Sequence, residues 1–240
     1  MGVDLIGVSK AYGSGKRRRV VLDTVSDSLH AERMTTVLAV PGAGKTTLAQ
    51  LVSGGLRPDS GLVRRRCRVS YPVGSQAVFS RLLTGYENIA FVSRVYGVAS
   101  RPVADFVAGI TGLGPEFGKR YSTYSRVQRI MFAYAVSWAL PFDLYVADNA
   151  LAAGGGQFRA LLDYTIEERR RSAGLLVATG GTDAVDSSDL VGVLHEGRIV
   201  YFESKDDAIA AFVKLRRTAA EPRRETEERE TEPEDSYDDL

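Results

Sequence analysis

Short apolar runs and helix-like segments alternate along most of the chain. Residues 35–40 (TTVLAV) form an apolar run that ends at a Pro-Gly pair, and residues 45–54 (KTTLAQLVSG) then place apolar side chains at helical spacing. Similar apolar runs predict three more buried strands, at 68–73, 143–148 and 174–179. Strands that alternate with helices are typical of an α/β fold with a largely parallel sheet.

The remaining pattern is helical apart from one hairpin. Residues 84–140 are mostly helical in pattern, and Ser100 is expected to cap one of these helices. Residues 190–202 (LVGVLHEGRIVYF) predict a β-hairpin that turns at Glu196-Gly197. Further helices are predicted at 157–171 and 205–215. The expected arrangement is an α/β core with a helical insertion at about 80–140.

Composition agrees with a globular domain. The chain has 240 residues, of which 44% are hydrophobic and 25% charged. No segment approaches the roughly 18 apolar residues that a membrane-spanning helix needs. The first ten residues lack the basic segment and apolar core of a secretion signal, and Cys67 is the single cysteine. We therefore expect a protein of the cytosol without a disulfide.

Charge is distributed unevenly along the chain. Residues 221–240 contain ten acidic and three basic side chains, a net charge of −7, so the other 220 residues carry about +8 of the total of +1. The acidic segment has almost no apolar residues with which to build a core. We expect residues 219–240 to form a disordered tail, with a solubilising role favoured over a specific docking role.

Two basic runs stand out in the remaining part, at 16–19 (KRRR) and 64–66 (RRR). Such runs occur in nucleic-acid-binding proteins, but no recognition motif accompanies them here. We interpret them as charge in solvated loops and expect no nucleic-acid partner. Contact with anionic lipid head groups is an alternative.

The segment 39–48 (AVPGAGKTTL) carries the clearest chemistry. It lies between a predicted strand and a predicted helix, where Gly42 and Gly44 allow backbone N–H groups to surround phosphate oxygens. The helix N-terminus adds the positive end of its dipole. Lys45 is expected to reach the β and γ phosphates, and the Thr46 hydroxyl to ligate Mg²⁺.

Two further positions bear on this phosphate site, Ala39 at the start of the loop and Asp148 at the end of another predicted strand. Ala39 stands where such a loop usually begins with glycine, and we expect its methyl group to tighten the first turn without removing a phosphate donor. Asp148 ends the apolar run 143–148. A carboxylate at the end of a buried strand is costly unless it meets a cation, and Mg²⁺ beside Thr46 would satisfy it.

The order of the motifs resembles that of ABC-transporter ATP-binding subunits, over about residues 2–215. Besides the phosphate loop, the resemblance rests on VSKAY (8–12), LTGYENI (83–89), TYSRVQR (123–129) and the hairpin. It implies a P-loop nucleotide-binding core over residues 1–218 with the helical insertion. It also implies that ATP and Mg²⁺ are the cofactors, with Thr46 and Asp148 at the metal. The segment TYSRVQR stands at the position of the ABC signature, the segment that faces the nucleotide of the partner subunit. The implied ATP-binding residues are Tyr12 against adenine, Ser125 in this signature segment, and Gly42, Ala43, Gly44, Lys45, Thr46 and Thr47.

Within that family, SYPVG (70–74), LTGYENIAF (83–91) and RVYG (94–97) look like the exporters of capsular and O-antigen polysaccharides. This narrower resemblance implies an integral membrane transporter subunit as partner, and a second ATP-binding subunit with which the chain dimerises. It implies a peripheral protein at the cytoplasmic face of the inner or plasma membrane.

The catalytic motifs depart from the family pattern. The position of the catalytic glutamate is Asn149, and the position of the switch histidine is Gly180. The two glycines that should follow Ser125 are Arg126 and Val127. An amide cannot accept a proton, and general-base assistance contributes about 10²–10⁴-fold to a rate. We expect binding of ATP with impaired hydrolysis.

Whether the chain is an enzyme stays open at this point. A non-hydrolysing pseudo-ATPase, acting as a regulatory or structural nucleotide-binding subunit, is the alternative function. A third possibility is an asymmetric pair in which another ATP-binding chain supplies the competent residues.

Overall fold

The computed structural model describes residues 1–220, and of Lys16 and Ala220 it describes only the backbone. The acidic tail predicted at 219–240 thus lies outside the described residues, except for 219 and 220, which belong to the last helix. None of the helices within residues 1–220 is both long and apolar enough to cross a membrane.

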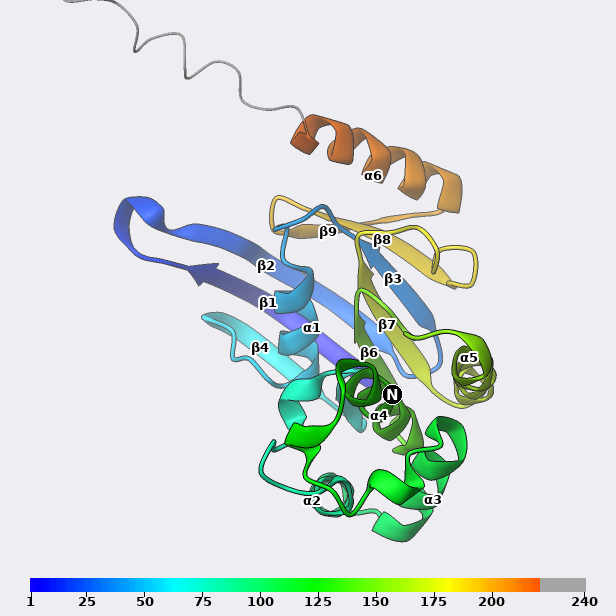
Figure 1. Ribbon diagram of the computed structural model, residues 1–240. Helices are drawn as coiled ribbons and strands as arrows, with labels where there is room; N and C mark the ends of the chain where they lie inside the picture. The colour runs from blue at the N-terminus through cyan, green and yellow to red at the C-terminus, as the bar shows by residue number, and fades with distance from the viewer. Residues whose placement is uncertain (221–240) are drawn as a thin grey trace, which may run out of the picture.

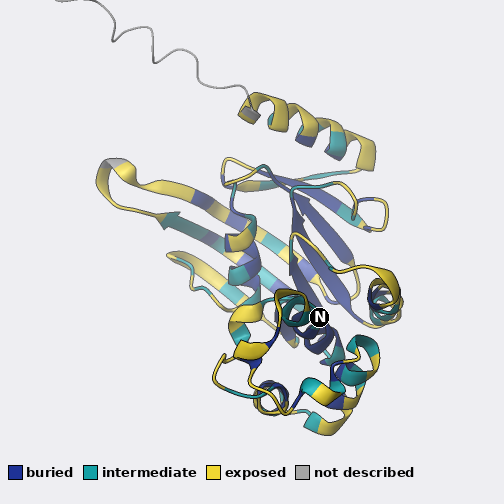
Figure 2. Cartoon of the chain, viewed as in Figure 1, coloured by how far each residue is buried: buried dark blue, intermediate teal, exposed yellow. Residues whose placement is uncertain are grey.

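A six-stranded sheet forms the centre of the molecule (Figure 1). Its strands pair in parallel from β5 to β8, and only the last pair, β8 with β9, is antiparallel. Every residue of the two central strands β3 and β7 is buried, as expected of parallel strands covered on both faces (Figure 2). The prediction of an α/β fold with a largely parallel sheet is confirmed. The order of strands is β5 (Val69–Pro72), β6 (Leu144–Asp148), β7 (Gly174–Thr179), β3 (Met34–Leu38), β8 (Leu190–His195) and β9 (Arg198–Phe202).

A second, antiparallel sheet lies beside the first and was not predicted from the sequence. It has the order β2-β1-β4, with β1 at Gly2–Tyr12, β2 at Arg19–His30 and β4 at Ser60–Arg65. Register shifts interrupt the pairing of β1 with β2 between Leu5 and Ala11, and Gly7 there has a φ of 58°. Such bulges break the alternation of buried and exposed side chains, which is the sequence signal for a half-buried strand.

Helix α1 (Lys45–Ser53) is enclosed between the two sheets. Its buried side chains, among them Leu48 and Leu51, share one apolar cluster with Leu5 of β1, Leu22 of β2 and Val146 of β6. The helix thus packs against both sheets, which also meet directly where β2 lies beside β9. This is the helix that follows the phosphate loop, so the loop is anchored by the core on both sides.

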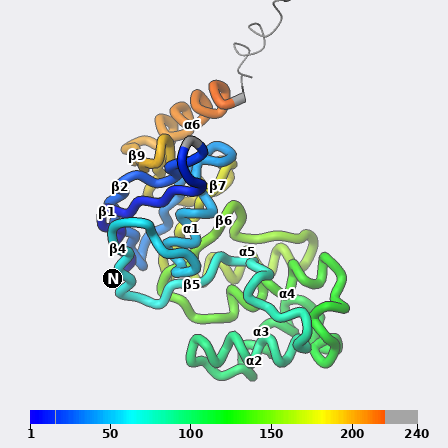
Figure 3. Tube along the Cα trace, turned by 90° about the vertical axis from the view of Figure 1, so that its left-hand side faces the viewer, coloured from blue at the N-terminus to red at the C-terminus, as the bar shows by residue number. Residues whose placement is uncertain are grey.

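Three helices follow β5 and lie together at one end of the molecule (Figure 3). They are α2 (Gly85–Val95), α3 (Ser100–Thr111) and α4 (Arg126–Ala139), with short 3-10 turns at Gln76–Val78, Gly114–Glu116 and Tyr121–Thr123. The expectation that Ser100 caps a helix is wrong. Ser100 is the first helical residue of α3, and the cap position belongs to Ala99, whose side chain has no oxygen to offer. Helix α2 instead has a capping box between Thr84 and Glu87.

Helix α5 (Gly156–Arg170) precedes β7 and packs against α3 and α4. Helix α6 (Lys205–Ala220) lies at the opposite end of the molecule and packs over β8, with Phe212 against Val191 and Val193 (Figure 1). The hairpin between β8 and β9 turns where it was predicted. Glu196 and Gly197 have φ values of 47° and 76°, as the two central residues of a type I′ turn require.

Candidate functional site

The phosphate loop connects the end of β3 to α1. Gly42 and Gly44 have φ values of 78° and 116°, which lie in the left-handed region that favours glycine. Gly44 is also the N-cap of α1, and a Cβ placed on it would lie 2.4 Å from the Cγ1 of Val21. Glycine at position 44 is therefore required both by the backbone conformation and by the close approach of β2.

Lys45 lies across the inside of this loop. Its Nζ donates hydrogen bonds to the backbone oxygens of Ala39, at 3.1 Å, and Val40, at 3.2 Å. Burial lowers the pKa of Lys45, and Asp148 partly opposes this by favouring the charged form. The backbone N–H of Ala43 donates to the Val40 oxygen at 3.1 Å, so it too helps to close the loop.

Ala39, at the position of the usual leading glycine, fits the loop. Its side chain is fully buried in the apolar cluster around α1, together with Val37 and Leu48. Its N–H donates to the Thr179 oxygen of β7 at 2.9 Å. The methyl group thus adds to the core and displaces no loop N–H.

Thr46 and Asp148 meet although they are 102 positions apart in sequence. The Thr46 hydroxyl donates to Asp148 Oδ2 at 2.6 Å, which joins the start of α1 to the end of β6. A hydroxyl and a carboxylate side by side are oxygen ligands of the kind that Mg²⁺ takes, together with phosphate and water. Within residues 1–220 no group of three or more His, Cys, Asp and Glu side chains gathers to hold a metal ion unaided. The donor set fits an ion that is shared with a phosphate-bearing ligand.

A cavity of about 340 Å³ opens over the loop. Tyr12 stands at its edge, 45% exposed, with its hydroxyl 3.2 Å from the Thr47 Oγ1. The ring therefore offers a flat apolar surface beside the phosphate loop. The lining residues are Tyr12, Arg19, Val21, Gly42, Gly44, Lys45, Thr46 and Thr47. The structure thus gathers the predicted adenine and phosphate residues in one place, and adds Arg19, which the sequence analysis did not single out.

Asn149 directly follows β6 in an unusual conformation. Its φ is 80°, its side chain is exposed, and its N–H donates to the Ala178 oxygen of β7 at 2.8 Å. Its side-chain amide lies 3.5 Å from Asp148 Oδ1. Asn149 lines a second cavity, of about 230 Å³, together with Thr179 and Asp183.

Gly180 follows β7 and faces the phosphate loop. A Cβ placed on it would lie 3.8 Å from Lys45 Nζ and 3.5 Å from the Ala39 oxygen, which are ordinary contact distances. The position is therefore next to the lysine that is expected to bind phosphate. In this chain it offers no side chain to the site.

Ser125 is the N-cap of α4 and lines neither of these two cavities. Its Oγ accepts from the Gln128 N–H at 3.1 Å, and its own N–H donates to Gln128 Oε1 at 2.8 Å. This capping box was not predicted, although the sequence SRVQ carries its pattern. Arg126 and Val127 are exposed in the first turn, Val127 by 62%.

Comparisons with known proteins agree with this geometry. The capsule polysaccharide export ATP-binding protein CtrD of Neisseria meningitidis serogroup B is 30% identical over 209 residues, which cover 87% of this chain and 97% of CtrD. The chain belongs to the ATP-binding subunits of ABC transporters. The ATP-binding protein BexA of Haemophilus influenzae is 30% identical, covering 84% of this chain and 93% of BexA. No protein-family model matches the chain.

Solved structures of ABC subunits share the fold. An ATP-binding subunit of an ABC transporter superposes with a TM-score of 0.73 at 16% identity, covering 89% of this chain and all of the other. The dimeric ATP-binding cassette MJ0796, bound to ADP and phosphate, superposes with a TM-score of 0.67 at 19% identity, covering 82% of this chain and 96% of the other. These likenesses agree in fold with the family membership, from which ATP binding follows.

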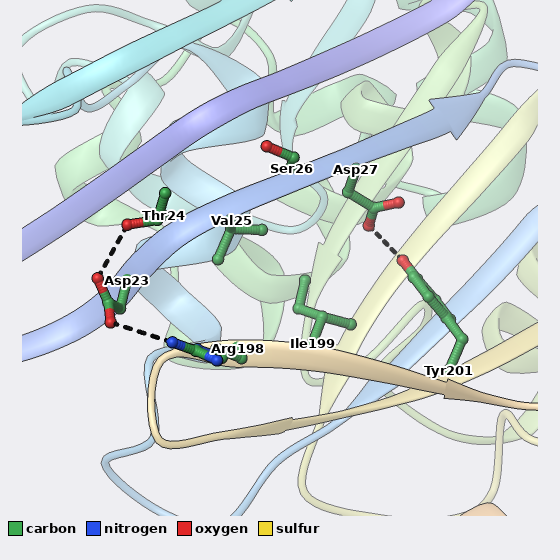
Figure 4. Close-up of a pocket in the computed structure, with 8 residues that line it drawn as sticks. All are labelled: Asp23, Thr24, Val25, Ser26, Asp27, Arg198, Ile199 and Tyr201. Carbon is green, nitrogen blue, oxygen red and sulfur yellow. Dashed lines mark hydrogen bonds and ion pairs between the residues drawn. The ribbon is translucent and has the colours of Figure 1, made fainter.

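The ABC subunit has a further cavity, of about 500 Å³, between β2 and β9 (Figure 4). At one end of the cavity, Arg198 Nη2 lies 3.9 Å from Asp23 Oδ2. At the other end, the Tyr201 hydroxyl donates to the Asp27 carboxylate. Val25 and Ile199 lie between these two contacts. Its lining residues come from β2 and β9, so the cavity lies between the two sheets. None of the predicted site residues lines it, so it is separate from the ATP site.

The two basic runs of this ABC subunit were expected to be charge in solvated loops, but each contains an arginine with a specific contact. Arg65 donates to the backbone oxygens of Leu51 and, at 2.8 Å, Val52, and so satisfies carbonyls in the last turn of α1. Arg19 donates to the Gly42 oxygen of the phosphate loop at 2.7 Å. One arginine from each run thus makes a specific backbone contact.

Proposed function

We propose that the chain is the ATP-binding subunit of a polysaccharide exporter of the capsule type. The observation that carries this proposal is the similarity over nearly the whole length to CtrD. A polysialic acid transport ATP-binding protein, KpsT of Escherichia coli, is also 27% identical, covering 88% of this chain and 96% of KpsT. Relatives that span the whole domain and share one cargo class support the same class for this chain.

ATP would lie in the cavity over the phosphate loop. Its base would stack on Tyr12, and its phosphates would accept hydrogen bonds from Lys45 and from the N–H groups at the start of α1. Thr46 and Asp148 would hold Mg²⁺, which in this class of site neutralises charge on the β and γ phosphates. The support is the 2.6 Å contact between Thr46 and Asp148 beside the glycine loop.

Hydrolysis by this subunit would be slow. Asn149 can orient a water molecule through its amide, but it cannot take the proton that the water must lose. Gly180 supplies no substitute, because its position beside Lys45 has no side chain. Phosphoryl transfer depends mainly on positioning and charge neutralisation, so a low rate would remain. ATP binding, rather than rapid turnover, would then drive the conformational step.

Two protein partners follow from this role. A second ATP-binding subunit would place its signature segment against the nucleotide, as Ser125 and the exposed start of α4 would do for the partner's site. An integral membrane subunit would contact the helical insertion and hold the chain at the cytoplasmic face of the membrane. Exposed apolar side chains at and before α2 support this docking face, namely Leu82, Tyr86, Phe91 and Val95.

A pseudo-ATPase is the second candidate, and one observation favours it. Asn149 has a left-handed backbone in which asparagine is tolerated and glutamate is strained. A segment with this conformation suits a nucleotide-binding subunit that regulates or stabilises an assembly without hydrolysis. The two candidates differ in whether phosphate is released, and they share the binding site.

The experiment that tests the exporter role is genetic. Deletion of the gene in its native host should abolish surface polysaccharide and leave the polymer inside the cell. The wild-type gene should restore export, and a Lys45→Ala gene expressed at the same level should not. Export that is unaffected by the deletion would refute the exporter role. Restoration by Lys45→Ala would instead show that ATP binding at this loop is dispensable.

A further inference from the structure

We propose that Arg19 binds the phosphate chain of the nucleotide, as a second cation beside Lys45. The inference rests on the ATP site proposed above and deepens it. It assigns a role to the first residue of β2, which ends the basic run 16–19 and does not belong to the phosphate loop itself.

The first observation is the register of the β1–β2 ladder. Tyr12 and Arg19 are cross-strand partners, the last pair before the loop that connects β1 to β2, and both line the cavity over the phosphate loop. Paired residues on neighbouring strands have Cβ atoms about 4.5–5.5 Å apart. The pairing therefore places a guanidinium group next to the ring that would stack on the base. A nucleotide on Tyr12 would extend its phosphates over the loop that Arg19 also contacts.

The second observation is how the guanidinium meets the loop. Arg19 Nη2 donates to the Gly42 oxygen at 2.7 Å. A Cβ placed on Gly42 would lie 3.2 Å from Nη2 and 3.6 Å from Nη1 of Arg19. The absence of a side chain at Gly42 thus leaves room for the guanidinium to lie against the loop. Lys45 is anchored in the same manner, to the Ala39 and Val40 oxygens, so two cations are held by one loop.

The third observation is that this cation has capacity left for an anion. Guanidinium has five N–H donors in a planar array, and the Gly42 oxygen uses one of them. Among the ion pairs formed within residues 1–220, none includes Arg19. The planar array matches phosphate oxygens, and its charge persists at every physiological pH. A polyphosphate is the anion that the adjoining loop is built to receive.

A matched control lies next to Arg19 in the sequence. Arg18 carries the same charge in the same run, but it lines a different cavity with Lys10 and Asp59. Arg18 does not line the cavity over the phosphate loop. Any effect of general positive charge on ATP affinity should be shared by the two arginines, whereas a direct contact should belong to Arg19 alone.

Calorimetry with Mg-ATP on the purified full chain tests the proposal. Arg19→Ala and Arg19→Gln should each weaken ATP about tenfold, since hydrogen bonds from a charged group are the strong ones. Arg19→Lys should lose less, and Arg18→Ala less than twofold. Arg19 is exposed, so melting curves should be unchanged. The affinity of the wild type should also fall more steeply with added KCl than that of Arg19→Gln.

The glutamine variant separates binding from a structural role. Glutamine can still donate to the Gly42 oxygen but has no charge, so wild-type affinity in Arg19→Gln would overturn the proposal. An equal loss in Arg18→Ala would overturn it as well. Lys45→Ala is measured in parallel. If Lys45→Ala loses affinity and Arg19→Gln does not, only the role of Arg19 fails. If the wild type binds no ATP, the proposed function fails with it.

Discussion

The phosphate loop after β3 and the segment after β6 are two parts of one site, held together by the contact of Thr46 with Asp148. In the phosphate loop, the left-handed positions are Gly42 and Gly44. After β6, the left-handed position is Asn149. The first part has glycine at both of its left-handed positions, and the second has a backbone that suits asparagine better than glutamate. The proposed retention of ATP binding and the proposed slow hydrolysis would thus have separate local causes.

The two departures from the family pattern at Ala39 and Gly180 differ in what they remove from the site. Ala39 replaces a glycine of the loop and is absorbed into the core without loss of a phosphate donor. Gly180 replaces a side chain that would stand beside Lys45, and nothing fills the space. Alanine at position 39 therefore removes no N–H donor from the loop, whereas glycine at position 180 leaves the site without a side chain beside Lys45.

Lys45→Ala is expected to have the largest effect. It removes the cation inside the loop and the hydrogen bonds that this cation donates to the Ala39 and Val40 oxygens. The affinity for Mg-ATP should fall roughly 30-fold or more, because charge-assisted hydrogen bonds are lost. Calorimetry measures this, with Lys205→Ala on α6, remote from the site, as control. Wild-type affinity in Lys45→Ala would show that the loop is not the phosphate site.

Asp148→Ala should have the next largest effect, on the dependence on Mg²⁺. In the wild type, ATP should bind about tenfold more tightly with Mg²⁺ than with a chelator, and the variant should lose most of that difference. Asp143→Ala, at the other end of the same apolar run, is the control. A full Mg²⁺ effect in Asp148→Ala would refute the pairing of Thr46 and Asp148 at a metal.

Asn149→Asp and Asn149→Glu separate chemistry from backbone strain. Both supply a carboxylate, but aspartate tolerates a φ of 80° better than glutamate does. Phosphate release should rise several-fold in Asn149→Asp with little change in stability. Asn149→Glu should lower the free energy of unfolding by roughly 1 kcal/mol. Asn149→Gly is the control, which should be as stable as the wild type and no faster. Equal stability of the Glu and Asp variants would show that the backbone does not select the residue here.

The sequence predicted the central part of this molecule well because its signals are local. The run 174–179 is strand β7 itself, and Glu196-Gly197 is the turn of the β8–β9 hairpin. Buried parallel strands are continuous apolar runs, and a type I′ turn depends on two residues. Both can be recognised without knowledge of the rest of the fold.

The antiparallel sheet and Arg19 could not be predicted in the same way. The bulges of β1 break the period of two, so the strand does not show its buried face in the sequence. Arg19 becomes part of the site only through its register opposite Tyr12 and the approach of β2 to the loop. Strand pairing brings the Arg19 side chain to the phosphate loop. The sequence of the basic run does not indicate which of its four residues reaches the site.

A pH dependence is the smallest effect that we expect, and it tests the role of the Lys45 charge in ATP binding. Burial lowers the pKa of Lys45 from its ordinary value of 10.5. Since ATP prefers the charged lysine, the affinity should be constant at neutral pH and fall as pH rises through the lowered pKa of the free protein, before 10.5 is reached. In Lys45→Arg the group does not titrate, so any affinity that this variant retains should stay constant over the same range. Calorimetry between neutral pH and the upper limit of stability measures both. Parallel curves for the two proteins would assign the alkaline loss of affinity to another group.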